Sequence, residues 1–591
     1  MKILLSLLLP WVLLAGSTVL AQTVAESDAV AIGRRIYLEG VLPDGRALRG
    51  VRPDTGEVTG ATAACVNCHR PSGLGQVEGN VSVPPITGRA LFGSGEPVHV
   101  RMDNNGTRGM SAQHALYDRI SFRTAVREGF LVTGGTMHPL MPRYLLSDAQ
   151  ADAVVAYLKT LSATMSPGVE GDIIRMATII APGVDSVRRK VFIDTLSTAV
   201  KQMNLNVRWG RRQKLIDVQE RRYHSRRQWA LDFWELSGPS STWGEQLAQR
   251  QRDKPVFALV SGLALDTWQP VQDFCESNRV ACWFPSLDLV PENAAQSNFS
   301  LYFSGGVGLE AQVMARALRE NKGRVVQISA ADPVAKGGAS ALRLALGTES
   351  SANLVDLSLA SGDRAIKAAL TGLTERDTVV LWLREADFAA LKELPTTAAQ
   401  VLVSTTAGGG EQIALPTALR RNARLVQPLE VQRMRTANLE RLEAWLAGSQ
   451  VPRVDLRLQS EVFFAAVSLQ ATLRGMLNNL HTDYLIERAE ATLTNFEIMQ
   501  VQDEIQAMMM GPMNKRPQQL EQRSAEQLAA SEAMTKAQMA HLEEMRLRGG
   551  TTVYPRLSLA QGQRFASKGA YLMRLNPDAL GVIGEPEWIV P

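Results

Sequence analysis

The chain has few of the side chains on which most hydrolytic and metal chemistry depends. Its 591 residues include only seven His and four Cys. No Ser-His-Asp set, P-loop, zinc-ligand spacing or paired-carboxylate motif stands out. These shortages argue against a hidden hydrolase.

The chain also has a small net charge and lacks long apolar runs beyond its first residues. The formal charge of +4 is small for this length, and neither an acidic nor a basic tail is present, so the composition gives no reason to expect a nucleic-acid partner. Beyond the first residues, no stretch is long and apolar enough to cross a bilayer, which takes about 20 apolar residues. The hydrophobic share of 45% is ordinary for a soluble globular protein, and the length predicts about three folding bodies.

Residues 1–21 have the pattern of a secretory signal peptide. Lys2 precedes an apolar run from Ile3 to Leu14, and Val19-Leu20-Ala21 is an acceptable small-x-small cleavage site. We expect cleavage after Ala21 and a periplasmic protein. The alternative is an uncleaved anchor, for which the run is short. No Cys follows the cleavage point, so a lipid anchor is not expected there.

The four Cys fall into two pairs. Cys65 and Cys68 precede His69, whereas Cys275 and Cys282 lie close together further along the chain. In an oxidising compartment this arithmetic predicts one structural disulfide between Cys275 and Cys282. Two free buried thiols are the alternative.

The segment from Cys65 to His69, Cys-Val-Asn-Cys-His, has the C-x-x-C-H form of a covalent haem site. The two thiols add to the vinyl groups of haem, and the adjacent His becomes an axial ligand of the iron. A bare C-x-x-C is also compatible with a redox dithiol or half a zinc site. The adjacent His, the missing zinc partners and the predicted export favour haem. We therefore predict one haem c, bound by Cys65 and Cys68, with His69 on the iron.

The iron needs a ligand on its other side. Met141 is followed by Pro142 and then by a predicted helix that Ser147 caps and that ends at Leu161. A rigid loop before a terminal helix suits a ligand that approaches the iron from the far side. The downstream candidates are His99, Met102, Met110, His114, Met137, His138 and Met141.

These features together resemble the mono-haem class I cytochromes c, over a domain of residues 28–165. The matching parts are a first helix at Ala29–Glu39, the motif Cys65–His69, the Met141-Pro142 pair and the helix Ser147–Leu161. The resemblance implies an all-α domain with Met141 as the sixth ligand, and Met137 and His138 remain rivals in the same loop. It also implies that Gly33 and Tyr37 pack the first helix against the last, near Tyr157.

A His/Met pair of ligands has a chemical consequence. The thioether sulfur favours Fe(II) and raises the potential above that of a His/His haem. Because the protein fills both axial positions, no iron site is open to O2 or peroxide. Electron transfer is therefore the expected role, and an enzyme is the less favoured interpretation.

Two stretches depart from a minimal cytochrome c. The residues from Val41 to Gly60 are rich in Gly, Asp, Pro and Arg, and a second insertion runs roughly from Ser94 to Gln113. We expect both to be surface loops. They are either plain decoration or a docking face for a redox partner.

The larger remainder alternates short apolar runs with helical patterns. Predicted strands include Ile173–Ile180, Val256–Val260, Cys282–Phe284, Val325–Ile328, Val379–Leu383 and Val401–Ser404. Repeated βα units predict mostly parallel sheets with helices on both faces, in two lobes. The pattern resembles the type I periplasmic solute-binding fold, the branch of the branched-chain amino acid receptors, over residues 172–591. The predicted fold class is thus multidomain, an all-α cytochrome c domain followed by a two-lobed α/β region.

Proteins of this fold close on a ligand by hinge motion, and ligands meet the loops that follow the strands. Four such places carry small residues: Ala181-Pro182-Gly183, Ser261-Gly262, Ser304-Gly305-Gly306 and Ser404-Thr405-Thr406. Their hydroxyl groups suit a carboxylate ligand. The equally weighted alternative is that they are helix caps and turns.

A Met-rich helical insertion is predicted near residues 502–548. Met508, Met509, Met510 and Met513 surround Gly511-Pro512, and a polar helical pattern follows. Thioethers are soft ligands for Cu(I), but Met stripes are more often adaptable packing. We expect an inserted arm for dimerisation or docking.

Three functions remain open at this stage. The first is an electron carrier whose second region docks it near a redox partner, a periplasmic dehydrogenase or another cytochrome. The second is a receptor in which a small molecule in the cleft is coupled to the haem. The third is an oxidoreductase acting on that ligand, for which neither a second cofactor nor a catalytic base is evident.

Overall fold

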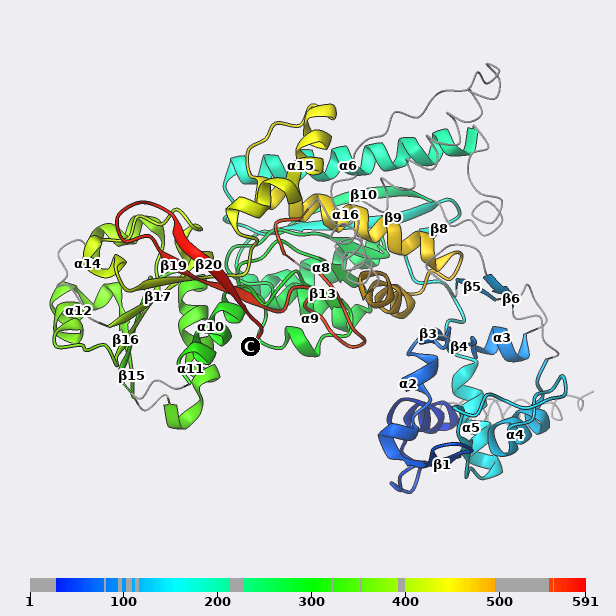
Figure 1. Cartoon of the computed structure of the whole chain (residues 1–591). Helices are drawn as coiled ribbons and strands as arrows, with labels where there is room; N and C mark the ends of the chain where they lie inside the picture. The colour runs from blue at the N-terminus through cyan, green and yellow to red at the C-terminus, as the bar shows by residue number, and fades with distance from the viewer. Residues whose placement is uncertain are drawn as a thin grey trace, which may run out of the picture. The chain divides into compact units, whose positions relative to one another are not determined.

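A computed structural model (Figure 1) describes residues 28–78, 81–93, 98–101, 109–111, 116–212, 227–319, 323–350, 353–391, 399–494, 552–555 and 557–591. The predicted signal peptide and the Met-rich segment, like the ligand candidates Met102 and His114, lie outside the described residues. No helix in the described ranges combines the length and the apolarity needed to span a membrane.

The chain forms two compact units. Among the described residues, the first unit holds residues 28–166 together with residues 473–487, and the second holds the remainder. The boundary at Leu473 falls inside helix α16 (Leu456–Met476). A segment that the sequence analysis assigned to the second region thus belongs to the first unit.

Five helices build most of the first unit. They are a helix at residues 28–39, α2 (Val66–His69), α3 (Gly88–Phe92), α4 (Arg119–Glu128) and α5 (Asp148–Leu158). Capping boxes start α4 at Asp118 and α5 at Ser147, and Gly129 ends α4 with a left-handed φ of 80°. The predicted helix after Met141-Pro142 is therefore confirmed.

The first helix packs closely on α5. A Cβ atom on Gly33 would lie 2.0 Å from the carbonyl oxygen of Ala153, so only Gly allows the two backbones to approach this far. The rings of Tyr37 and Tyr157 meet with centroids 5.3 Å apart. The packing expected for Gly33 and Tyr37 is confirmed.

The prediction of an all-α domain needs correction, because small antiparallel sheets accompany these helices. The strands are β1 (Arg49–Arg52), β2 (Gly56–Thr59) and β7 (Arg143–Tyr144) in one sheet, and the pairs β3 (Gln76–Glu78) with β4 (Val81–Val83), and β5 (His99–Arg101) with β6 (Gly109–Ser111). The Pro-Asp-Thr-Gly run, residues 53–56, was interpreted as loop composition. These residues instead form a turn: Gly56 has φ 86° and joins two paired strands.

The second unit contains two sheets with the same strand order. The first sheet runs β10-β9-β11-β12-β13 with β8 beside β9, and the second runs β15-β14-β16-β17-β18-β19-β20. The bounds are β8 (Val169–Glu170), β9 (Ile173–Ile180), β10 (Gln228–Glu235), β11 (Ala258–Val260), β12 (Ala281–Trp283), β13 (Ser300–Leu301), β14 (Val325–Ser329), β15 (Leu354–Ser358), β16 (Thr378–Trp382), β17 (Gln400–Ser404), β18 (Ala423–Gln427), β19 (Ala570–Leu575) and β20 (Val582–Ile589).

Each set of five successive strands is parallel and follows the order second, first, third, fourth, fifth. This is a doubly wound arrangement, in which ligand sites lie beyond the carboxyl ends of the strands. β19 and β20, from the end of the chain, extend the second sheet in antiparallel fashion. The prediction of repeated βα units with mostly parallel sheets is confirmed.

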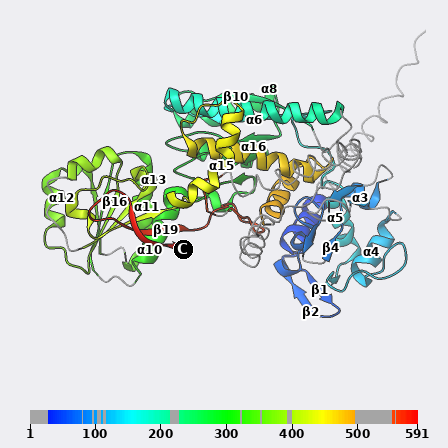
Figure 2. The same ribbon diagram turned by 45° about the horizontal axis from the view of Figure 1, so that its top comes forward.

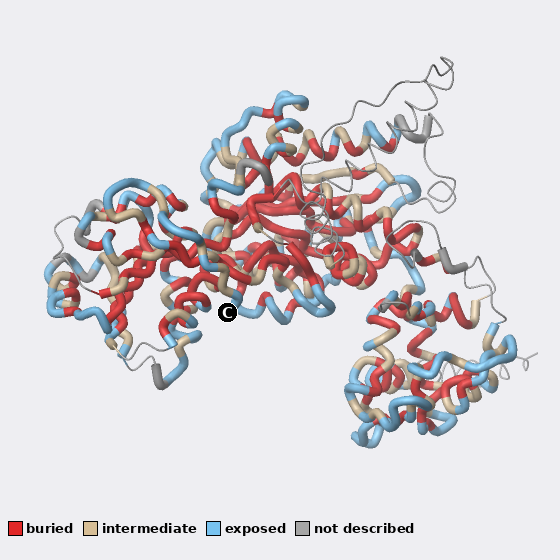
Figure 3. The backbone as a smooth tube through the Cα atoms, in the orientation of Figure 1, coloured by how far each residue is buried: buried red, intermediate tan, exposed pale blue. Residues whose placement is uncertain are grey.

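Helices cover these sheets, and the central strands are buried (Figure 3). The helices are α6 (Ser186–Arg212), α8 (Trp243–Asp253), α9 (Gln269–Asn278), α10 (Gly306–Ala317), α11 (Pro333–Ser350), α12 (Asp363–Leu370), α15 (Gln432–Gly448) and α16. α6 lies alongside β10 (Figure 2). Residues Glu385–Leu391 form a 3-10 helix.

Candidate functional site

The haem motif folds into a single helical turn. Cys65 is the N-cap of α2, and its carbonyl oxygen accepts hydrogen bonds from the backbone N–H groups of Cys68 (3.3 Å) and His69 (3.0 Å). Residues three and four apart share one face of a helical turn. The turn therefore presents two thiols and one imidazole on one side, and neither thiol takes part in a disulfide.

The imidazole of His69 is buried and engaged at one of its two nitrogens. Its Nδ1 lies 3.1 Å from the carbonyl oxygen of Pro84, which fixes the tautomer with the proton on Nδ1 and leaves Nε2 as the ligand atom. Burial lowers the pKa of His69 to about 4. The ring is therefore neutral at ordinary pH, as a metal ligand must be.

Two buried tyrosines hold the backbone at both ends of the motif. The hydroxyl of Tyr144 donates to the carbonyl oxygen of Ala63 (2.9 Å), and the hydroxyl of Tyr37 donates to that of Arg70 (2.7 Å). The sequence analysis did not assign Tyr144 a role. In the sequence, the only indication of a role for Tyr144 is that it follows Met141 by three residues.

Met141 is the predicted sixth ligand. It packs against the core cluster of the first unit, together with Cys65 and Val66. The guanidinium of Arg143 donates to the backbone oxygens of Met141 (2.5 Å) and Met137 (3.1 Å) and so holds this loop.

Four other candidates for the sixth ligand lie among the described residues. Met137 is not among the residues that pack on the cluster, and His138 is exposed. The Nδ1 of His138 accepts a hydrogen bond from the backbone of Leu140 within its own loop, at 3.3 Å. His99 and Met110 lie in the hairpin β5–β6.

The donor set fits a covalent haem. Two adjacent thiols, a neutral imidazole with Nδ1 already engaged, and a thioether near the same core are the groups that such a haem takes. Within the described part of the chain, no group of three or more His, Cys, Asp or Glu side chains is placed to hold a bare metal ion.

One of the four predicted solute-binding places is filled from within. Glu310 of α10 is fully buried, and its carboxylate accepts hydrogen bonds from the hydroxyls of Ser404, Thr405 (3.1 Å) and Thr406 (2.9 Å) and from the backbone N–H of Thr406 (3.0 Å). Ser404 also caps α13 (Thr405–Gly408). These hydroxyls do bind a carboxylate, but it belongs to the protein.

A second internal carboxylate lies beyond β12. Glu461 of α16 is buried and accepts hydrogen bonds from the hydroxyls of Ser286 and Tyr554 (3.0 Å). Arg457 joins Glu461 (3.1 Å) to Asp288 (2.6 Å). The sequence analysis missed this network because its members come from three distant segments.

The place at Ser261-Gly262 differs from the others. Ser261 is buried in a left-handed conformation with φ 56°, and its hydroxyl has no hydrogen-bond partner among the described residues. Phe284, after the neighbouring strand β12, is left-handed too, with φ 48°. Such strain in non-Gly residues is uncommon and gathers at functional sites. In contrast, the Ser304 hydroxyl accepts from the N–H of Gly306 at 3.2 Å, as in a turn.

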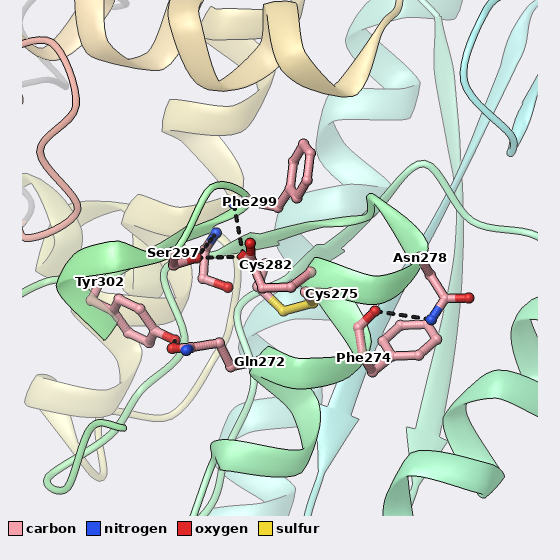
Figure 4. Close-up of a disulfide and its surroundings, with 10 residues drawn as sticks. Gln272, Phe274, Cys275, Asn278, Cys282, Ser297, Phe299 and Tyr302 are labelled. Carbon is pink, nitrogen blue, oxygen red and sulfur yellow. Dashed lines mark hydrogen bonds between the residues drawn. A yellow bond between two sulfur atoms is a disulfide. The ribbon is translucent and has the colours of Figure 1, made fainter. Parts of the chain in front are cut away.

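Cys275 of α9 and Cys282 of β12 form a disulfide with Cα atoms 6.2 Å apart (Figure 4). Both residues are buried. Nearby, the hydroxyl of Tyr302 donates to the side-chain oxygen of Gln272 at 2.6 Å. The bridge staples α9 to the first sheet of the second unit.

Comparisons with known proteins match parts of this chain. Residues 56–162 match the family model of cytochrome c. No curated protein matches the chain.

Solved structures similar to this chain are substrate-binding proteins. A leucine-binding protein from Thermotoga maritima is 12% identical, with a TM-score of 0.40 over 70% of this chain and 98% of its own. A fatty acid transporter substrate-binding protein from Thermomonospora curvata is 12% identical, with a TM-score of 0.40 over 72% and 95%. A periplasmic substrate-binding protein from Ralstonia solanacearum is 12% identical, with a TM-score of 0.42 over 70% and 100%. Residues 56–162, with their C-x-x-C-H turn, are thus a cytochrome c domain, carried on the same chain as a doubly wound α/β unit.

Proposed function

We propose that this protein is an exported electron carrier that holds one covalent haem c between His69 and Met141. The observation that carries the proposal is the single turn Cys65–His69, with the Nδ1 of His69 already bound to the Pro84 carbonyl. The cytochrome c family match over residues 56–162 supports it. The working domain extends over residues 28–165, after a signal peptide of residues 1–21, and the protein acts in the periplasm.

Each residue of the site has a defined task. Cys65 and Cys68 would hold a haem through two thioether bonds, and His69 would offer Nε2 to its iron. The bound haem supplies one-electron Fe(III)/Fe(II) chemistry. Pro84 holds the imidazole orientation, and Arg143 holds the loop that carries Met141. A thioether ligand from Met141 would disfavour the oxidised state and so raise the haem potential.

The region 172–591, most of which belongs to the second unit, acts as a docking platform for a redox partner, a periplasmic dehydrogenase or another cytochrome. Internal carboxylates support this role over solute binding, because Glu310 and Glu461 already engage the hydroxyls beyond β17 and β12. A solute with a carboxylate would have to displace a buried group that is fully hydrogen-bonded.

A receptor is the second candidate. The buried and unpartnered hydroxyl of Ser261, on a left-handed backbone, favours a small-molecule ligand beyond β11. Under this alternative, ligand binding is coupled to the haem potential.

Removal of the thioether anchors tests the central proposal. We expect the Cys65→Ala/Cys68→Ala double variant to lose covalent haem, measured as haem that acid and organic solvent extract from the purified chain. The Cys275→Ala/Cys282→Ala variant is the matched control and keeps covalent haem. Covalent haem that persists after loss of Cys65 and Cys68 would overturn the proposal.

A further inference from the structure

A buried carboxylate from a distant part of the chain lies beside the haem motif. Glu487, on a helix over residues 482–494, accepts hydrogen bonds from the backbone N–H of Ser72 (2.7 Å) and from its hydroxyl (2.6 Å). Both residues belong to the first unit and are buried. Glu487 is therefore a constituent of the cytochrome c unit, although 418 positions separate it from His69 in number.

The contact with Ser72 ties Glu487 to the haem ligand. Ser72 follows His69 by three residues, so their Cα atoms are at most about 11 Å apart. The intervening turn is tight. The N–H of Gly75 donates to the carbonyl oxygen of His69 (3.2 Å), and the N–H of Gly73 donates to the carbonyl oxygen of Arg70 (3.1 Å). The carboxylate of Glu487 is thus joined to the haem motif by hydrogen bonds within the protein.

Opposing influences balance the two protonation states of Glu487. Burial disfavours the anion, and the charge of Asp483 acts in the same direction, whereas Arg70 and the two hydrogen bonds from Ser72 favour the anion. Burial prevails and raises the pKa of Glu487 to about 8. The Ser72 hydroxyl can accept as well as donate, so it can partner either protonation state.

We propose that Glu487 is a redox-linked proton site of the haem domain. When one electron enters the iron and converts Fe(III) to Fe(II), the Glu487 carboxylate takes one proton from water and becomes a carboxylic acid; oxidation returns both. The electron comes from the redox partner, or from an electrode in the experiment below. The inference rests on the proposed haem site and adds a proton to its chemistry.

Thermodynamic linkage between reduction and protonation gives the expected size of the change in haem potential. With an effective dielectric of about 20, a tenfold change in proton affinity requires a unit charge within about 12 Å. Binding effects are reciprocal, so the haem potential must depend on the protonation of Glu487. A tenfold difference corresponds to about 59 mV for one electron.

Other titratable groups near Glu487 need to be separated from it. Asp483, Arg70 and Tyr37 interact with it electrostatically. His481, on the same segment, has its pKa lowered to about 4 by burial, so it stays neutral in the relevant range. The propionates of a bound haem also titrate. A substitution at Glu487 itself distinguishes it from all of these.

The experiment is a spectroelectrochemical titration of the full-length, haem-loaded protein between about pH 6 and pH 10, a range around a carboxyl whose pKa is raised well above that of an exposed Glu. We expect the potential to fall with pH in the wild-type protein and to flatten in Glu487→Gln. Glu490→Gln is the matched control, since Glu490 lies on the same helix, is also buried and pairs with Arg564 (2.9 Å). It should keep the wild-type slope.

Ser72→Ala provides an independent arm. Loss of a hydrogen bond to the anion raises the proton affinity of Glu487, so the pH-dependent step should move to higher pH without disappearing. A redox-difference infrared spectrum should show a protonated carboxyl C=O band on reduction, absent in Glu487→Gln.

A slope that is unchanged in Glu487→Gln would overturn the inference and assign the proton to the propionates. A flat potential in wild-type protein with intact covalent haem would overturn it as well and leave the electron-carrier proposal standing. Absence of covalent haem from the wild-type protein would instead overturn the proposed function.

Discussion

Among single residues, Met141 carries the clearest spectroscopic prediction. We expect Met141→Ala to keep covalent haem, because Cys65 and Cys68 are intact, but to lose the Met-to-iron charge-transfer band of the oxidised protein. The measurement is the long-wavelength absorption spectrum. Met137→Ala is the control, four residues away in the same loop, and should retain the band. The opposite pattern would make Met137 the sixth ligand.

A second prediction at this scale concerns the buried carboxylate of Glu310. Burial raises the pKa of Glu310 to about 7, above the value near 4.3 of an exposed Glu. Between these values the folded state binds more protons than the unfolded state, so stability falls as pH rises through this window.

We therefore expect the free energy of unfolding of Glu310→Gln, relative to wild type, to increase between about pH 4 and pH 8. A shift of this size is worth on the order of 3 kcal/mol. Urea unfolding followed by tryptophan fluorescence measures the difference. A relative stability that is independent of pH would show that Glu310 is ionised throughout, held by the hydroxyls of Ser404, Thr405 and Thr406.

At the scale of secondary-structure elements, the close contact between the first helix and α5 gives a prediction about stability. Gly33→Ala places a methyl group against the backbone oxygen of Ala153, and a backbone atom cannot swing aside as a flexible side chain can. We expect a loss of about 1–3 kcal/mol of stability, typical of overpacking, which outweighs the gain of up to about 1 kcal/mol in helix propensity.

Thermal unfolding followed by calorimetry, which reports on both units, measures this loss. Gly308→Ala in α10 is the control, because no atom lies within 4 Å of a Cβ built there. It should be neutral or slightly stabilising. Equal effects of the two substitutions would mean that helix propensity, rather than packing, controls both sites.

For the whole molecule, the open question is whether the second unit binds a solute. A thermal-shift screen against amino acids, short acids, alcohols, amides and aromatic acids addresses it, because a ligand at a hundredfold its dissociation constant stabilises a protein by about 2.7 kcal/mol. As a docking platform, the protein should show no shift. A shift that Ser261→Ala abolishes and Ser404→Ala preserves would contradict this and establish a receptor.

The division into units also belongs to this scale. The chain passes from the second unit into the first at residue 473, contributes Asn479 and Glu487 there, and continues in the second unit after residue 487. The amide of Asn479 donates to the backbone oxygen of His99 at 2.6 Å. No local pattern predicts such an excursion, because the contacts that define it join residues hundreds of positions apart.

The sequence by itself determined the features that depend on local chemistry. Cys65, Cys68 and His69 form one helical turn because of their spacing, and Ser147 starts α5 because its side chain caps the first turn. β9 follows from a mostly apolar run, interrupted by Arg175 and Thr178, which suits a strand buried in a parallel sheet. β10 was missed, since its side chains are mostly half-buried and the run is interrupted by Asp232.

Only the tertiary structure decided which polar groups meet. The hydroxyls of Ser404 to Thr406 suited an external carboxylate in the sequence, and folding supplied Glu310 instead. Glu487 carries no mark in the sequence that links it to Ser72. A buried charge or hydroxyl finds whichever partner the packing of distant segments brings within hydrogen-bonding distance, so its role depends on the whole fold and not on its neighbours in the chain.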